Sequence, residues 1–188
     1  CRARPCYGGV RVLRMQPRLR SGTAFLISAN GYLLTAAHVV ENREDVRVFT
    51  PEGEFAAEVV VRDPANDVAL LRADITGTPL HLASAGDLRR GQEVMALGYP
   101  LVNMQGESQK ATFGRVNALS GLEDDLRFIQ MDTAIKPGNS GGPLLSADGL
   151  VVGVVSRTIN QQAVVGGTGA VAQNVNYALK TDYVLPML

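Results

Sequence analysis

The apolar residues of this chain fall into short runs that are separated by glycines, prolines and polar residues. Runs of about four to eight residues between turn signals are typical of β-strands. We therefore expect strands at Val10–Leu13, Ser21–Ser28, Tyr32–Thr35, Val46–Thr50, Phe55–Arg62, Val68–Arg72, Glu93–Gly98, Ala111–Ser120, Arg127–Asp132, Pro143–Ser146, Leu150–Ser156 and Val175–Leu179.

Turn signals join several of these runs. Asn30-Gly31 between two apolar runs predicts a hairpin, and Pro51–Gly53 and Ala147–Gly149 predict further turns. Helical segments are scarce: Ala36–Val40 fits one turn, and Thr181–Leu188 fits a short C-terminal helix limited by Pro186. Many short strands with turn punctuation predict an all-β barrel or sandwich. If the chain has two halves, the polar Ala83–Gly91 segment is the best crossover between them.

The composition narrows the class of protein. The chain has 188 residues, which fits one β domain or two small ones, and its 46% apolar content argues against disorder. Its formal net charge is zero, whereas a general nucleic-acid binder carries a basic excess. No apolar stretch is long enough to span a membrane. The chain starts with Cys and has no signal peptide, so we expect a processed form or an excised domain.

The residues that could bind a metal are few and scattered. The cysteines, Cys1 and Cys6, form either a small disulfide in an oxidising compartment or two idle thiols. The two histidines, His38 and His81, lie far from them in the sequence, and a zinc site as a rule needs four ligands. The sequence therefore implies no metal and no organic cofactor.

The segment Gly138–Pro143, which reads GNSGGP, is the most informative one. Glycines around Ser140 leave its hydroxyl accessible and let backbone N–H groups converge on one point, as an oxyanion hole requires. An ordinary glycine-rich turn is the alternative. The segment also matches the G-x-S-x-G pattern of α/β-hydrolases, but no helix follows and both histidines precede Ser140, which excludes the usual topology of those enzymes.

Two further segments carry candidate chemistry. His38 is flanked by small and branched apolar residues, so it should be partly buried, either as a plain core histidine or as a base. Asp67 opens an apolar strand and needs a hydrogen-bond partner if it points inward, unless it only caps a turn. Taken alone, each of these residues has a plain structural explanation as well as a catalytic one. Together, His38, Asp67 and Ser140 supply the base, the orienting acid and the nucleophile of a serine-protease triad.

At these residues the chain resembles the chymotrypsin-fold serine proteases of the HtrA/Deg type. The resemblance rests on the segments TAAHVV, NDVALL and GNSGGPL, on SGTAFLIS before the histidine, and on FIQMDTAIKP before the serine. GLVVGVVS follows the serine motif, and NVNYALKTDYVLPML looks like the end of such a domain. The resemblance covers about Ser21 to Leu188.

This resemblance implies a single trypsin-like serine protease domain over 1–188, made of two six-stranded β-barrels at about 8–82 and 92–180. His38 would be the general base, Asp67 its orienting acid rather than nearby Asp63, and Ser140 the nucleophile. The N–H groups of Gly138 and Ser140 would form the oxyanion hole. By the same analogy Ala134 would be the floor of the primary substrate pocket, and Ser156 would line the groove for the substrate backbone. The resemblance further implies peptide or protein substrates and a location in the bacterial periplasm or outside the cell.

The chain departs from this family in places. Family members usually carry a PDZ domain after the protease, and only a few residues follow Leu179 here. The loop before Ser21 is short, so the sequence leaves the oligomeric state open. Asn139 is neutral, so it cannot form the charge pair with a freshly cut N-terminus that activates digestive relatives. A protease-fold binding or sensor module with a latent or inactive site, within a longer protein, is the alternative function.

Overall fold

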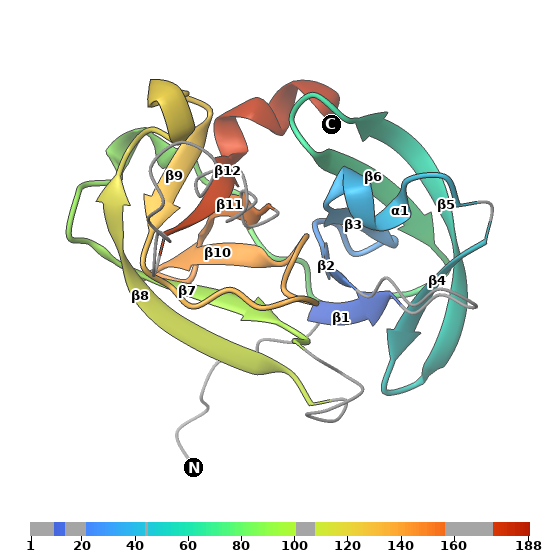
Figure 1. Ribbon diagram of the computed structural model, residues 1–188. Coiled ribbons are helices and arrows are strands. Elements are labelled where there is room, and N and C mark those ends of the chain that lie inside the picture. The colour runs from blue at the N-terminus through green and yellow to red at the C-terminus, as the bar shows by residue number, and fades with distance from the viewer. Residues whose placement is uncertain (1–9, 14–21, 44, 101–107, 157–174) are drawn as a thin grey trace, which may run out of the picture.

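The computed structural model of the protein describes residues 10–13, 22–43, 45–100, 108–156 and 175–188 (Figure 1). Its strands form two closed antiparallel barrels that lie side by side, the first from the N-terminal half of the chain and the second from the C-terminal half. The all-β fold of two six-stranded barrels that the sequence predicts is therefore confirmed.

The first barrel has the spatial strand order β1-β2-β3-β6-β5-β4. Its elements are β1 (Val10–Leu13), β2 (Gly22–Leu26), β3 (Tyr32–Thr35), the one-turn helix α1 (Ala37–Val40), β4 (Val46–Thr50), β5 (Gly53–Asp63) and β6 (Val68–Ala73). The pairing of Leu13 with Val48 closes the barrel between β1 and β4. The helix α1 interrupts the strand pattern directly after β3.

The second barrel has the spatial order β10-β11-β12-β9-β8-β7. Its elements are η1 (Ala85–Asp87) in the connection from the first barrel, β7 (Glu93–Gly98), β8 (Lys110–Ala118), η2 (Leu122–Asp124), β9 (Phe128–Met131), β10 (Pro143–Ser146), β11 (Val151–Val155) and β12 (Asn176–Lys180). Pairing of β7 with β10 closes this barrel, with Ala96 opposite Leu144.

The predicted turns are found where the sequence places them. Leu26 pairs with Leu33 on either side of Asn30-Gly31, and Gly31 has a φ of 89°, a conformation that glycine adopts without strain. Thr50 pairs with Gly53 across the next predicted turn. The short strands of this chain are thus tied to their neighbours by local turn chemistry.

Three clusters of buried apolar residues hold the barrels together. One fills the first barrel and another fills the second. The third joins the two barrels, with Phe25, Leu34 and Leu70 from the first and Leu145 and Val154 from the second. All five residues of β2 are buried, because one face of this strand lines its own barrel while Phe25, on the other face, packs in the cluster between the barrels. The residues between the barrels are therefore about as fully buried as those inside them.

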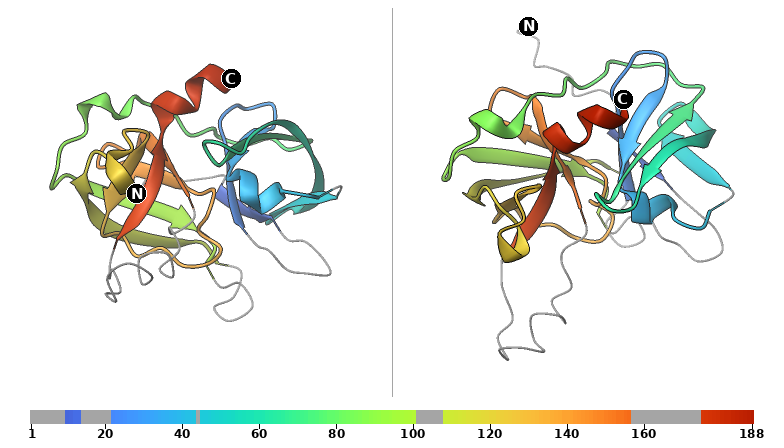
Figure 2. Two further views of the ribbon diagram at one scale, coloured as in Figure 1. Left: turned by 45° about the horizontal axis from the view of Figure 1, so that its top comes forward. Right: turned by 90° about the horizontal axis from the view of Figure 1, so that it is seen from above.

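The C-terminal helix predicted for Thr181–Leu188 consists of two successive 3₁₀ turns, η3 (Thr181–Tyr183) and η4 (Leu185–Met187). They lie over the junction of the two barrels (Figures 1 and 2). Val184 is fully buried in the cluster between the barrels, and the Asp182 carboxylate accepts hydrogen bonds from the Ser84 hydroxyl and the Ala85 N–H. The end of the chain thus anchors the connection between the two halves.

Both cysteines lie outside the described residues, and so does the loop at 14–21 that precedes β2. No helix in the described ranges has the length and apolar character to cross a membrane.

Candidate active site

His38 lies on α1, the helical turn that follows β3. The neighbouring Ala37, Val39 and Val40 are buried in the first barrel, whereas the His38 side chain keeps 17% of its surface exposed. Because the helix has only one turn and its apolar positions face the core, the imidazole points away from the core toward the turn before β6. The partial burial expected from the sequence is confirmed.

Asp67 lies in the turn before β6 and has a φ of 56°, in the left-handed region that Asp tolerates better than most residues. The turn is stabilised by Asp63, whose carboxylate accepts hydrogen bonds from the N–H groups of Ala65 and Asn66 and from the Asn66 side chain. The Asp67 carbonyl accepts a bond from the Ala37 N–H. Asp63 therefore shapes the turn, and Asp67 is the carboxylate aimed at α1.

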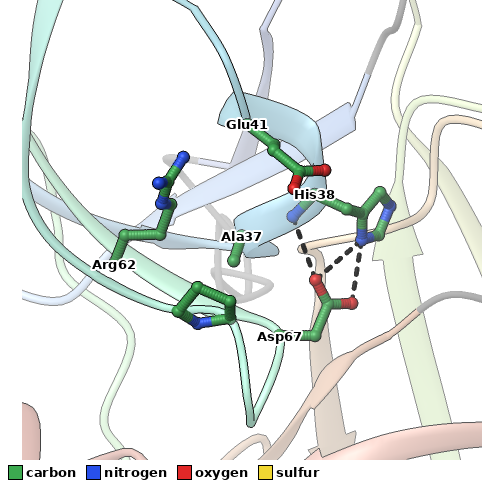
Figure 3. Close-up of a pocket in the computed structure, with 6 residues that line it drawn as sticks. Ala37, His38, Glu41, Arg62 and Asp67 are labelled. Atoms are coloured by element: carbon green, nitrogen blue, oxygen red, sulfur yellow. Dashed lines mark hydrogen bonds and ion pairs between the residues drawn. The ribbon is translucent and has the colours of Figure 1, made fainter.

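The side chains of His38 and Asp67 are in direct contact (Figure 3). The His38 Nδ1 atom lies 2.9 Å and 2.8 Å from the two carboxylate oxygens of Asp67, and the His38 N–H donates to Oδ1 at 3.0 Å. An ionised carboxylate can only accept hydrogen bonds, so Nδ1 carries the proton and Nε2 of the neutral ring is left as an acceptor. This is the tautomer that a general base requires.

Ser156 lies directly after β11 and adds a third donor to this carboxylate. Its hydroxyl donates to Asp67 Oδ2 at 2.8 Å. Burial raises the pKa of the Asp67 carboxyl, but the His38 side chain and backbone and the Ser156 hydroxyl outweigh it, so the pKa lies below its ordinary value. Asp67 is therefore ionised at neutral pH. The sequence did not reveal this contact, since it joins residues 89 positions apart.

Ser140 lies in the tight loop between β9 and β10, and this loop packs against the His38 segment. A Cβ on Gly141 would lie 2.4 Å from Thr35 Oγ1 and 2.6 Å from the Ala36 nitrogen, so only glycine permits the approach, and its φ of 83° also requires it. The Gly141 N–H donates to the Val155 carbonyl. The residue after Ser140 is thus bonded to the residue before Ser156, so the serine loop and the end of β11 lie next to each other.

The backbone N–H groups of Gly138 and Ser140 make no hydrogen bond to any other described residue. Gly138 is buried and has a φ of 103°, while a Cβ there would lie 2.4 Å from the Tyr99 carbonyl oxygen. Backbone N–H groups inside a protein are normally paired. Two that have no partner among the described residues, next to a serine side chain, could donate hydrogen bonds to an oxyanion.

A small cavity of about 80 Å³ lies beside the imidazole and the Asp67 carboxylate. It is lined by Ala37, His38, Glu41, Arg62, Pro64 and Asp67 (Figure 3). Its walls combine two acidic side chains, Glu41 and Asp67, and the basic Arg62 with apolar atoms, so it can take a small group next to the histidine.

The remaining candidates lie apart from this pair. His81 is exposed on the connection between the barrels, and Ala134 is exposed between β9 and β10, so its role as a pocket floor stays a prediction. Within the described ranges, no three His, Cys, Asp or Glu side chains come together in a way that could hold a metal ion.

Two antiparallel barrels, with a His–Asp pair on the first and a glycine-flanked serine on the second, define the chymotrypsin-like fold. The chain belongs to the trypsin-like peptidase family, since the family model described as a trypsin-like peptidase domain matches residues 22–154. Within that family it is of the HtrA/DegP type.

The relatives support this placement. A probable periplasmic serine endoprotease, DegP-like, of Halomonas elongata is 42% identical over 147 residues, which cover 76% of this chain and 30% of that protein. The protein y4bJ of Sinorhizobium fredii is 40% identical over 161 residues, covering 85% of this chain and 25% of the relative. The solved structure of the HtrA-type protease AlgW with a tripeptide matches with a TM-score of 0.78 at 31% identity, covering 95% of this chain and 58% of that one. The chain thus spans a third or less of the length of these two curated relatives.

Proposed function

We propose that this chain is a serine endopeptidase that hydrolyses peptide bonds through an acyl-enzyme, with Ser140 as nucleophile. His38 is its general base, and Asp67 orients the imidazole. The observation that carries the proposal is the connected path from the Ser140 loop through Val155 and Ser156 to Asp67 and His38.

In this mechanism the Ser140 hydroxyl attacks the carbonyl carbon of the scissile bond while His38 Nε2 takes its proton. The carbonyl oxygen becomes an anion that accepts hydrogen bonds from the N–H groups of Gly138 and Ser140. His38 then gives the proton to the leaving amine, and a water molecule, activated by the same nitrogen, releases the acyl group. Throughout the cycle Asp67 keeps the proton on Nδ1 and stabilises the imidazolium.

The proposed substrates are proteins or peptides, since the solved HtrA-type relative carries a bound tripeptide and the curated relative is named an endoprotease. Ala134 as pocket floor offers no counter-ion for Lys or Arg, so we expect cleavage after small or medium apolar residues. Mapping of cleavage sites by mass spectrometry tests this, and a preference for cuts after Lys or Arg would show it to be wrong.

We further propose that the protein works in the bacterial periplasm or outside the cell, as the name of the DegP-like relative suggests. Fractionation of cells that express the full-length protein tests this placement.

The proposed chemistry is tested by labelling the purified protein with a fluorophosphonate and measuring the intact mass. We expect one adduct on the wild-type protein and none on Ser140→Ala. The peptidase activity of this variant should fall by about 10⁶-fold, as loss of the nucleophile does in subtilisin. His38→Ala should abolish labelling as well. His81→Ala is the matched control, because it removes the other histidine of the chain and should label normally.

Failure of the folded wild-type protein to label or to cleave any peptide would overturn the proposal. The protease-fold binding module would then be the better account of this chain.

A further inference from the structure

Thr23, on β2 of the first barrel, contacts the Ser140 loop of the second barrel through both its side chain and its backbone. Its hydroxyl donates to the Gly138 carbonyl at 2.7 Å, and its N–H donates to the Ser140 carbonyl at 2.8 Å. The same hydroxyl accepts a bond from the Tyr99 N–H at 3.1 Å. Thr23 has no exposed surface, so water does not compete for these bonds.

These contacts hold the carbonyl groups of Gly138 and Ser140, the two residues whose N–H groups would form the proposed oxyanion hole. The peptide between Gly138 and Asn139 is held at both ends, by Thr23 at its carbonyl and by the Lys136 carbonyl at its N–H. The peptide between Ser140 and Gly141 is likewise held by Thr23 and by the Val155 carbonyl. Two fixed peptides therefore flank the one that carries the Ser140 N–H.

The peptide between them is fixed as well. The Asn139 carbonyl accepts a hydrogen bond from the Gly142 N–H at 3.0 Å. In a trans peptide the C=O and N–H groups point in opposite directions, so this bond turns the Ser140 N–H away from Gly142. The loop contains no helix or strand of its own. Its carbonyl groups are instead held by Thr23, which belongs to the other barrel.

We propose that Thr23 is a positioning residue of the peptidase: its hydroxyl and N–H hold the Ser140 loop with both oxyanion donors aimed outward. This inference rests on the proposed function and adds that the competence of the loop depends on the first barrel. Electrostatic stabilisation of an oxyanion depends on donors held in place before the reaction, so loosening the loop lowers kcat more than it raises KM.

Thr23→Val tests the role of the hydroxyl, because it keeps the shape and methyl group of the side chain but cannot bond to Gly138 or Tyr99. Loss of a whole oxyanion donor costs about 10²–10³ in turnover. We expect Thr23→Val to lower kcat by about 10- to 100-fold, with KM changed by less than about threefold, since the donors are loosened rather than removed. Thr23→Ser restores the hydroxyl and should bring kcat back to within about threefold of wild type.

Thr181→Val is the matched control. Thr181 is also fully buried, and its hydroxyl lies within hydrogen-bond distance of the Ala83 and Val152 carbonyls, in a region that does not touch the Ser140 loop. We expect this variant to lower the melting temperature as Thr23→Val does, while kcat stays unchanged. A merely structural role of Thr23 would make the two variants alike in both measurements.

A second measurement uses a peptide aldehyde, which forms a tetrahedral adduct with the serine and places an oxygen in the oxyanion hole. Its affinity for Thr23→Val should fall by about the same factor as kcat/KM. If Thr23→Val does not fold, Thr23→Cys takes its place, since a thiol is a weaker donor of similar size, and a smaller loss of kcat is expected.

If the wild-type enzyme is active and the folded Thr23→Val or Thr23→Cys variant has the same kcat and the same affinity for the aldehyde, the inference about Thr23 is overturned and the proposed function stands. A wild-type protein that neither cleaves peptides nor reacts with the aldehyde would overturn the proposed function instead.

Discussion

Substitution of Asp67 by Asn separates the electrostatic role of this carboxylate from its role in holding the fold. In the native site, Oδ1 accepts from the His38 N–H and Nδ1, and Oδ2 accepts from Nδ1 and the Ser156 hydroxyl. Asn has one acceptor oxygen and one NH₂ donor. With its oxygen at the Oδ2 position, the NH₂ group would face the His38 N–H, and two donors would meet. The amide oxygen therefore takes the Oδ1 position.

In this orientation the NH₂ group lies at the former Oδ2 position, where it donates to Nδ1 or to the Ser156 hydroxyl. Nδ1 then becomes an acceptor, and the imidazole proton moves to Nε2, the atom that must accept the proton of Ser140. The enzyme keeps its shape and loses its base. The corresponding change in a trypsin-like triad costs about 10⁴ in kcat, equal to roughly 5.5 kcal/mol of barrier. Folding loses only the difference between charged and neutral hydrogen bonds, about 1–2 kcal/mol.

The assay compares kcat and the free energy of unfolding of Asp67→Asn with those of wild type, and ¹⁵N NMR of the histidine ring reports the tautomer. Asp63→Asn is the control, since Asp63 lies in the same turn but bonds only to Ala65 and Asn66. It should lose the bond from the Asn66 side chain to the carboxylate, worth about 1–2 kcal/mol in this partly exposed turn, and keep kcat within about fivefold. An Asp67→Asn protein that retains a tenth of its activity, or whose ring stays protonated at Nδ1, would refute the reasoning.

Three more predictions concern the same site. The lowered pKa of Asp67 means that its contribution to stability is complete above about pH 4, the ordinary carboxyl value, and is lost as the pH falls through the lower folded value; urea unfolding at pH 6 and pH 3 should show a larger loss in wild type than in Asp67→Asn, which keeps the losses due to Asp125 and Asp182, and equal losses would contradict it. Ser156→Ala should raise the pKa of Asp67 toward its ordinary value and lower kcat by about 5- to 10-fold, the equivalent of about 1 kcal/mol for a charge-assisted bond to a partly exposed group; an unchanged rate in a steady-state assay would count against the bond. Gly141→Ala should cost more than about 3 kcal/mol of stability because its Cβ would lie 2.4 Å from the Thr23 carbonyl oxygen, while Gly91→Ala, at nearly the same φ of 82° but with open space around it, should cost only about 1 kcal/mol; equal losses in urea unfolding would show that the crowding argument is wrong.

The strands of this protein were largely predictable from the sequence. Their local signals, such as the apolar run Tyr32–Thr35 after Asn30-Gly31, act over a few residues, and the elements of the structure start and end within two residues of the predicted ones in nearly every case. The C-terminal segment was predicted as a short helix, and its two 3₁₀ turns are the form that Pro186 and the short length permit.

The candidate site was predictable in part. The contexts of His38, Asp67 and Ser140 are local, so each could be recognised from its neighbours. The preference for Asp67 over Asp63 as the partner of His38, made on the position of Asp67 at the start of an apolar strand, agrees with the hydrogen bonds of the two carboxylates. The resemblance assigned Ser156 to the substrate groove only, because nothing near it in the sequence indicates its bond to the carboxylate.

The sequence by itself determined where the strands and turns form, since hydrophobic period and turn residues act between neighbours in the chain. Only the tertiary structure decided which groups meet across the two barrels. The hydroxyls of Thr23 and Ser156 bond to residues 115 and 89 positions away. Such contacts follow from barrel closure and from the buried cluster between the barrels, which bring distant segments together with water excluded, and no local pattern encodes their geometry.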